Sequence, residues 1–113
     1  MNYERLEVWQ RATNLAIEVF KYAKTFKDYG FKDQLTRSVL SIPSNIAEGM
    51  TRLGNKEKRH FLAIAKASSA ELNTQVIIGS EIDYIERSIA SNWKKEIYII
   101  SAMLSGLMKA LDK

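Results

Sequence analysis

The chain has 113 residues, of which 46% are hydrophobic and 27% are charged, with a single histidine, a single proline and no cysteine. This length and composition favour one folded domain, 1–113, and exclude an intrinsically disordered chain, a disulfide framework and a thiolate metal site. Seventeen Lys and Arg against thirteen Asp and Glu give a formal net charge of +4, which alone identifies no partner. With no signal peptide and no apolar run of the roughly 18 residues that a membrane span needs, we expect a cytoplasmic protein without a membrane partner.

Apolar residues recur at intervals of three and four along most of the chain, which predicts helices, and no stretch alternates with the period of a strand. The first helix is predicted over about 4–26. A polar turn around Gly30 separates it from a second helix over about 32–50, and another turn around Gly54 follows.

The third predicted helix is the longest, over about 56–87, with Asn55 as its N-cap. A weaker break, where Ser91 or Asn92 would cap the next helix, precedes a fourth helix over about 93–111. Short connections between helices of similar length favour antiparallel neighbours. The predicted fold is therefore all-α, an antiparallel up-down four-helix bundle.

Pro43 lies inside the second predicted helix, where a proline lacks an amide donor and costs about 3 kcal/mol unless offset. Two arrangements are open: one helix kinked at Pro43, or a break in which Ser41 caps a new helix. The apolar face continues in register from Leu35 to Ile46, which favours one kinked helix. The neighbouring serines and Asn45 can hydrogen-bond the freed carbonyl groups.

The predicted helices carry more apolar residues than a lone small bundle needs, which indicates self-association. The alternative is a crowded monomer core with ordinary exposed aliphatic side chains. The surplus is largest on the fourth helix, which carries Trp93, Ile97, Ile99, Ile100, Met103, Leu104, Leu107, Met108 and Leu111.

The segment 34–49, QLTRSVLSIPSNIAEG, resembles the signature of the four-helix-bundle proteins encoded in intervening sequences of 23S ribosomal RNA. Segments 6–12 and 61–72 support the resemblance, which covers nearly the whole chain. It implies a small bacterial bundle that assembles as a homopentamer, without enzymatic activity, with a nucleic-acid-binding role and a biochemical function that is poorly defined. Thr36 and Leu40 depart from the pattern, which tends to carry Arg and Ala there, so helix two has one fewer cation.

Three charged residues, Arg37, Glu48 and Glu71, lie near the apolar stripes of their helices and are candidates for burial. We interpret them with the signature residues as a polar network that fixes helix register, in which Arg37 or a serine hydroxyl contacts Glu71. A role in gripping a partner is the alternative. The network and signature set is Arg37, Ser41, Pro43, Asn45, Glu48 and Glu71.

The sequence offers little for catalysis, and we expect neither an enzyme nor a bound metal or cofactor. A carboxylate-bridged dimetal site needs two Glu-x-x-His motifs, and His60 is the only histidine. Thiol chemistry and a glycine-rich phosphate loop are both excluded by the composition and glycine spacing. His60 is interpreted as part of a basic surface.

Division of the predicted bundle into two halves places the whole charge surplus at one end. The basic residues assigned to that end are Arg5, Arg11, Arg52, Lys56, Lys58, Arg59, Lys66, Lys109 and Lys113, against Glu4, Glu7, Glu48, Glu57 and Asp112. The remaining half has eight basic and eight acidic residues. The third helix also begins with bases and ends with acids, against the preference of its macrodipole, which favours a partner for the basic end.

The leading functional hypothesis is a non-enzymatic oligomer that presents basic bundle ends to RNA or DNA, with little sequence reading. The residues predicted to contact nucleic acid are Arg52, Lys56, Lys58, Arg59, His60 and Lys66. The alternatives are an adaptor that docks an acidic partner protein, such as a nucleic-acid enzyme, and a structural oligomer in which carboxylates neutralise the basic end.

Overall fold

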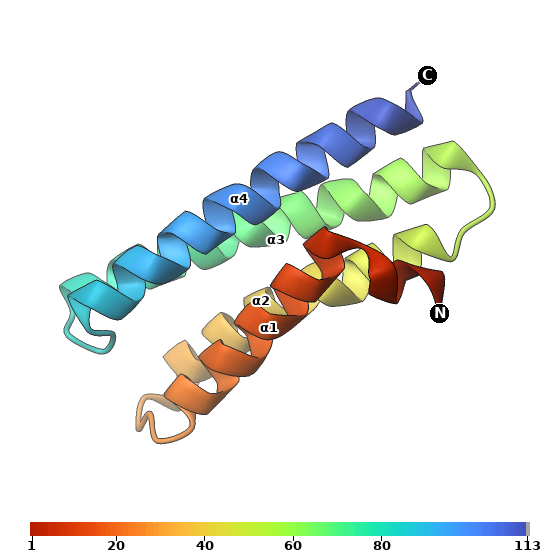
Figure 1. The fold of residues 1–113 in the computed structure, drawn as a ribbon. Coiled ribbons are helices and arrows are strands. Elements are labelled where there is room, and N and C mark those ends of the chain that lie inside the picture. The colour runs from red at the N-terminus through yellow and green to blue at the C-terminus, as the bar shows by residue number, and fades with distance from the viewer. Residues whose placement is uncertain (113) are drawn as a thin grey trace.

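The computed structural model describes residues 1–112 and consists of a short 3-10 helix, η1 (Asn2–Arg5), and four α-helices (Figure 1). Successive helices run in opposite directions, so the N-terminus, the α2–α3 loop and the end of α4 lie at the same end of the molecule (Figure 1). The predicted all-α antiparallel bundle is confirmed. The helices are α1 (Glu7–Ala23), α2 (Tyr29–Met50), α3 (Asn55–Glu81) and α4 (Arg87–Leu111).

The predicted start of the third helix is right to within one residue, but its N-cap is wrong. Gly54 is the N-cap, and Asn55 is the first helical residue. The side-chain amide of Asn55 instead donates to the carbonyl oxygen of Leu111 at 3.4 Å, which links the start of α3 to the end of α4.

The predicted break between the third and fourth helices is misplaced by several residues. Helix α3 ends at Glu81 and α4 already begins at Arg87, so Ser91 and Asn92 lie inside α4. The reversal is made by Asp83, which has a φ of 63°, a left-handed conformation that Asp tolerates better than most residues. A turn without glycine or proline at its bend is hard to locate in a sequence.

Gly79 permits this reversal to pack tightly. Its carbonyl oxygen accepts hydrogen bonds from the backbone amides of Tyr84 and Ile85, at 2.9 and 3.1 Å. A Cβ atom at Gly79 would lie 2.6 Å from Cδ1 of Ile85 and 3.0 Å from Cζ of Phe31. Gly79 therefore leaves room for Ile85 to enter the core, and a side chain at position 79 would require Ile85 to shift.

The two loops at this end are joined by side-chain hydrogen bonds. The carboxylate of Asp28, the N-cap of α2, accepts from the backbone amide of Phe31 at 3.0 Å and from the hydroxyl of Tyr84 at 2.9 Å. The hydroxyl of Tyr22 accepts from the backbone amide of Glu86 at 3.0 Å. The α1–α2 loop and the α3–α4 loop are thereby held together.

Helix α2 runs without a break from Tyr29 to Met50 with Pro43 in its interior, so the arrangement with one helix is confirmed over the one with two. The kink at Pro43 stays a prediction. The proline ring is buried, and Asn45 donates from its side-chain amide to the carbonyl oxygen of Ser41 at 2.8 Å. The carbonyl that loses its helical donor to Pro43 is that of Val39, so this bond does not fill the predicted role, which stays a prediction.

The apolar surplus on the fourth helix is mostly covered by the chain itself. Of its nine large apolar residues, only Ile99 is exposed, and the others are buried or half-buried against the core. The large apolar side chains exposed on the helices lie elsewhere as well, on α1 and α2 (Ile17, Phe20, Tyr29 and Leu40) and on α3 and α4 (Ile77, Ile78, Tyr98 and Ile99). These exposed side chains, rather than helix four as a whole, are therefore the candidates for self-association.

Candidate nucleic-acid interface

Three of the predicted nucleic-acid contacts, Arg52, Lys58 and Arg59, form what we call the end cluster, at the junction of the α2–α3 loop and α3. The guanidinium of Arg52 lies 2.6 Å from Glu48 and 3.8 Å from Glu57, and its Cζ lies 4.8 Å from the ring centre of Phe61. A planar guanidinium suits both the carboxylate and the aromatic face. The charge of Arg52 is therefore already paired.

The other two members of the end cluster are also bound within the chain. The ammonium group of Lys58 donates to the backbone carbonyl of Arg52, and Arg59 forms an ion pair with Asp112 near the end of α4. These contacts close the α2–α3 loop and tie α3 to α4. Half of the predicted contact residues thus have a structural role in the chain.

Lys56, His60 and Lys66 behave differently, because all three are exposed and have no ion pair or side-chain hydrogen bond with residues 1–112. Lys56 and His60 lie one helical turn apart in the first turns of α3. Lys66 was assigned to the basic end, but it lies about 15 Å further along α3, in a groove against α4. The residues predicted to contact nucleic acid therefore lie in two places, the basic end of the bundle and a groove between α3 and α4.

Arg11 overturns the simple division of charge between two halves. It lies 2.8 Å from Glu7 and 2.9 Å from Glu96, a residue that the division placed in the opposite half. The hydrogen bond to Glu7, and then that to Glu96, raise the pKa of Arg11 above its ordinary value. Arg11 joins α1 to α4 by an ion pair and contributes no unpaired charge to the basic end.

Fewer charges oppose the macrodipole of the third helix in the structure than the sequence indicated. Because α3 ends at Glu81, Asp83 and Glu86 lie beyond it, and Glu86 is the N-cap residue of α4, where a negative charge is favourable. Glu57 also places a carboxylate in the first turn of α3. The basic start of α3 remains, but its acidic end consists of Glu81 alone.

The expected burial of Arg37, Glu48 and Glu71 is wrong, because all three are exposed. Arg37 pairs with Asp33 at 2.9 Å, and it is the hydroxyl of Ser38 that reaches Glu71, at 3.4 Å. These charges lie at the margins of the helix stripes, where a long side chain turns outward to water.

A small polar network does join α2 to α3, among less charged residues. The hydroxyls of Ser41 and Ser68 lie 2.8 Å apart, and the side-chain amide of Asn45 donates to the Ser41 hydroxyl at 2.9 Å. Small hydroxyl residues let the two helices approach while their polar atoms stay satisfied. The signature residues Ser41 and Asn45 therefore connect α2 to α3.

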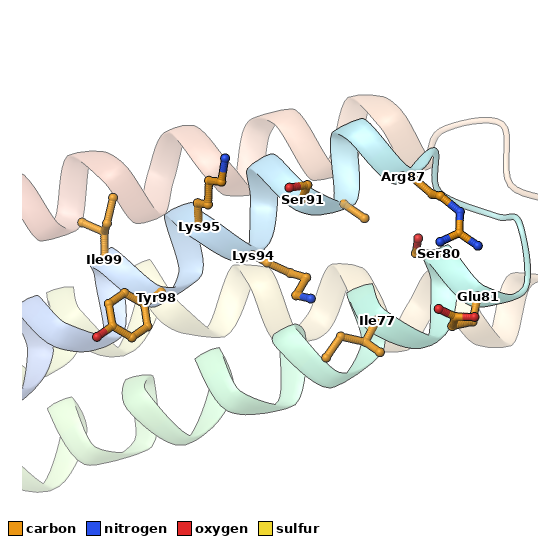
Figure 2. A pocket seen from close by; sticks show the side chains of 10 residues that line it. Ile77, Ser80, Glu81, Arg87, Ser91, Lys94, Lys95, Tyr98 and Ile99 are labelled. Carbon is orange, nitrogen blue, oxygen red and sulfur yellow. The ribbon is translucent and has the colours of Figure 1, made fainter.

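The groove between α3 and α4 is a site that the sequence reasoning missed. It consists of two adjoining hollows of about 750 and 630 Å³, and both are lined by Lys94 and Tyr98. Figure 2 shows the side chains that line the larger of the two. Its cations are Lys66, Arg87, Lys94 and Lys95. The last three were assigned to the half of the bundle with no net charge. The zero net charge of that half concealed the clustering of these three cations. The adjacent lysines followed by a tyrosine one turn later were the available signal.

Within residues 1–112, no helix is long and apolar enough to cross a membrane. In the same part of the chain, no three His, Cys, Asp or Glu side chains are grouped so that they could hold a metal ion.

Comparisons with known proteins agree with the fold. The crystal structure of a protein of unknown function from the S23 ribosomal protein family of Bacteroides thetaiotaomicron is similar, with a TM-score of 0.84 over 90% of this chain and 98% of that chain. Its sequence identity is 21%, so the likeness shows the fold alone. No protein of curated function matches in sequence. Residues 4–106 match the family described as 23S rRNA-intervening sequence protein, and the chain therefore belongs to that family.

Proposed function

We propose that this chain is a non-enzymatic, self-assembling bundle of the cytoplasm that binds nucleic acid through exposed cations, with little sequence specificity. The observation that carries the proposal is the set of exposed, unpaired basic side chains on α3, beginning with Lys56 and His60 at the basic end. Phosphate groups are the natural partners of such side chains. A family named for an rRNA intervening sequence supports the same partner.

The end cluster adds cations that can change partners. The side chains in the Arg52–Glu48 and Arg59–Asp112 pairs are each between about 40 and 60% exposed, and exposed ion pairs of this kind contribute only about 0–1 kcal/mol. A phosphate can replace either carboxylate and keep the guanidinium hydrogen-bonded. Flexible lysines and exchangeable arginines contact the backbone of a nucleic acid and carry little sequence information.

Self-association is supported by an apolar hollow of about 590 Å³ between α1 and α2, lined by Trp9, Ile17, Phe20, Leu40 and Pro43 among others. Ile17, Phe20 and Leu40 are 49, 43 and 50% exposed there. A second, unlike apolar patch, Ile78 with Ile82, lies at the C-terminal end of α3. Contact between unlike patches of neighbouring copies builds a closed ring, and five copies is the number that the family resemblance implies. A ring multiplies weak phosphate contacts by avidity.

The binding test measures anisotropy of labelled RNA and DNA with the full chain. The variant K56E/H60E leaves the internal pairs of Lys58 and Arg59 intact, and we expect affinity to fall about tenfold at low salt. The matched control K24E/T25E changes the net charge equally at the opposite end and should have a much smaller effect. Absence of binding by the unmodified chain overturns the nucleic-acid function, and equal losses in the two variants overturn the basic end as its site.

The assembly test measures mass in solution by light scattering. We expect the unmodified chain to form an oligomer and F20E/L40E to dissociate it, while I99E on α4 does not. A monomeric unmodified chain, or an oligomer that F20E/L40E leaves intact, contradicts the assignment of the α1–α2 hollow as an interface. Binding of an acidic partner protein that survives nuclease treatment, without binding of RNA or DNA, would favour the adaptor instead.

A further inference from the structure

The α3–α4 groove is long and open. It follows α3 from Lys66 to Glu81, a length of about 22 Å at the rise of an α-helix. Figure 2 shows Lys94 and Tyr98 projecting from α4 toward α3, and Arg87 near Ser80 and Glu81 at the loop end. Because the two hollows share Lys94 and Tyr98, one extended ligand can occupy both.

The groove carries an uncompensated positive charge. Lys66, Arg87, Lys94 and Lys95 have no carboxylate within 4.0 Å among residues 1–112, and Glu81 is the one acidic residue that lines the hollows. The cations are spread along the groove rather than gathered at a point. This distribution fits a linear polyanion better than a single small anion.

An exposed aromatic ring lies in the middle of these cations. Tyr98 is 77% exposed and lies one helical turn after Lys94, on the same side of α4. Unlike the hydroxyls of Tyr22 and Tyr84, its hydroxyl forms no hydrogen bond within residues 1–112. Packing of the bundle gives no reason for a tyrosine at this position. A base can stack on its free face.

We propose that the α3–α4 groove binds single-stranded RNA, with phosphates on Lys66, Lys94 and Arg87 and a base stacked on Tyr98. The inference rests on the proposed nucleic-acid function. It adds the groove to the basic end as a second binding surface and names single-stranded RNA as the ligand of the groove. In a duplex the bases are stacked on one another and their faces are inaccessible, so Tyr98 contributes only to binding of an unpaired strand. Asn73 and Ser101 line the same groove as candidate partners of ribose 2′-hydroxyl groups, which favours RNA over DNA.

The test compares three labelled probes with the full chain at constant salt: an oligouridylate of about 12 nucleotides, a deoxy strand of the same length, and an RNA duplex. We expect Y98A to weaken oligouridylate binding by about 5- to 150-fold, the range for loss of one stacked base, and to leave duplex binding unchanged. Y98F keeps the ring and should retain full affinity. The matched control is Y29A, which removes another highly exposed tyrosine, on α2.

Each alternative has its own result. If the unmodified chain binds none of the three probes, the proposed function fails and the groove with it. If it binds oligouridylate but Y98A and Y29A behave alike, or if K94E loses no more affinity than K24E, only the groove assignment is overturned. Equal affinity for the ribose and deoxyribose strands overturns the preference for RNA. If polyglutamate displaces oligouridylate as readily as a second RNA strand does, the groove binds an acidic peptide instead.

Discussion

The end cluster and the α3–α4 groove are both basic, both involve α3, and differ in whether their charges have partners. In the end cluster, Arg52 and Arg59 are bound to carboxylates and Lys58 to a carbonyl oxygen. In the groove, Lys66 and Lys94 have none of these contacts. The comparison teaches that a run of basic residues predicts where charge lies, whereas only the fold decides whether that charge is available to a ligand.

The comparison has a physical consequence for each region. Replacement of a paired arginine leaves a carboxylate without its partner, so the loss appears in the free energy of unfolding. Replacement of an unpaired lysine removes an interaction only with a ligand, so the loss appears in binding. Substitutions in the end cluster should therefore act mainly on stability, and substitutions in the groove mainly on affinity.

The largest expected effect is the salt dependence of single-strand binding. Three phosphate contacts in the groove give a slope of about −2 in log affinity against log salt, so affinity should fall roughly 20-fold between about 50 and 200 mM salt. In K66A/K94A the fall should be only about 3-fold, because two contacts are gone. R52A/R59A makes the same change in net charge and should keep a slope closer to the original, because these arginines reach a phosphate only by leaving their carboxylates. Fluorescence anisotropy titrations measure all three, and equal slopes in the two variants would break the distinction between the regions.

Gly49 offers the next largest effect, on stability. A Cβ atom at this position would lie 3.0 Å from Cβ of Phe61 and 3.1 Å from the backbone oxygen of Lys58, both of which are fixed in position by α3. We expect G49A to lower the free energy of unfolding by about 1–3 kcal/mol, as in other overpacked sites. G106A is the control, because a Cβ there meets nothing within 4 Å and should stabilise α4 by roughly 0.5–1 kcal/mol. Urea unfolding measures both free energies. Gly49 lies against Lys58 and Phe61, so equal changes in the two variants would show that the packing of α2 on α3 does not fix the geometry of the end cluster.

The smallest expected effect separates single residues of the two regions. R52A should lose about 1 kcal/mol of stability, from the exposed ion pairs and the contact with Phe61, and should lose less single-strand affinity than K94A. K94A should show the reverse, with stability within about 0.5 kcal/mol of the unmodified chain. Thermal unfolding and anisotropy on the same samples test the pair. Equal losses of affinity in R52A and K94A would contradict the difference between the two regions.

The fold was predictable to the extent that it depends on local periodicity. The apolar register from Leu35 to Ile46 correctly favoured one helix through Pro43, because burial of a continuous face offsets the local defect. The break after α3 was missed because Asp83 adopts the left-handed conformation usually assigned to glycine. Element type follows from periodicity over many residues, whereas a boundary depends on the conformation of a single residue.

The candidate site was less predictable, because charge pairing connects residues far apart in the sequence. Neither the Arg59–Asp112 pair nor the Arg11–Glu96 pair can be recognised from spacing along one helix. The groove likewise requires the register of α4 against α3, which brings Lys66 and Lys94 into the lining of the same hollow. Only the candidates that depended on a single helix, Lys56 and His60, were correctly placed at an exposed helix start.

The hydrogen bonds between Asp28 and the loops make the end of the bundle opposite the end cluster sensitive to protons. The amide of Phe31, and then the hydroxyl of Tyr84, lower the pKa of Asp28 below its ordinary 3.8, and Asp28 raises the pKa of Tyr84 above its ordinary 10.0. An acid whose pKa is lowered on folding stabilises the fold at pH values above its ordinary pKa, and this stabilisation is lost as the pH falls through the pKa of the folded state. A tyrosine whose pKa is raised on folding stabilises the fold at pH values below its ordinary pKa, and this stabilisation is lost as the pH rises through the pKa of the folded state. The hydrogen bonds between the two loops are therefore kept across the neutral range and weaken in acid and in alkali. In the neutral range they hold in place the end of the groove where Arg87 lies.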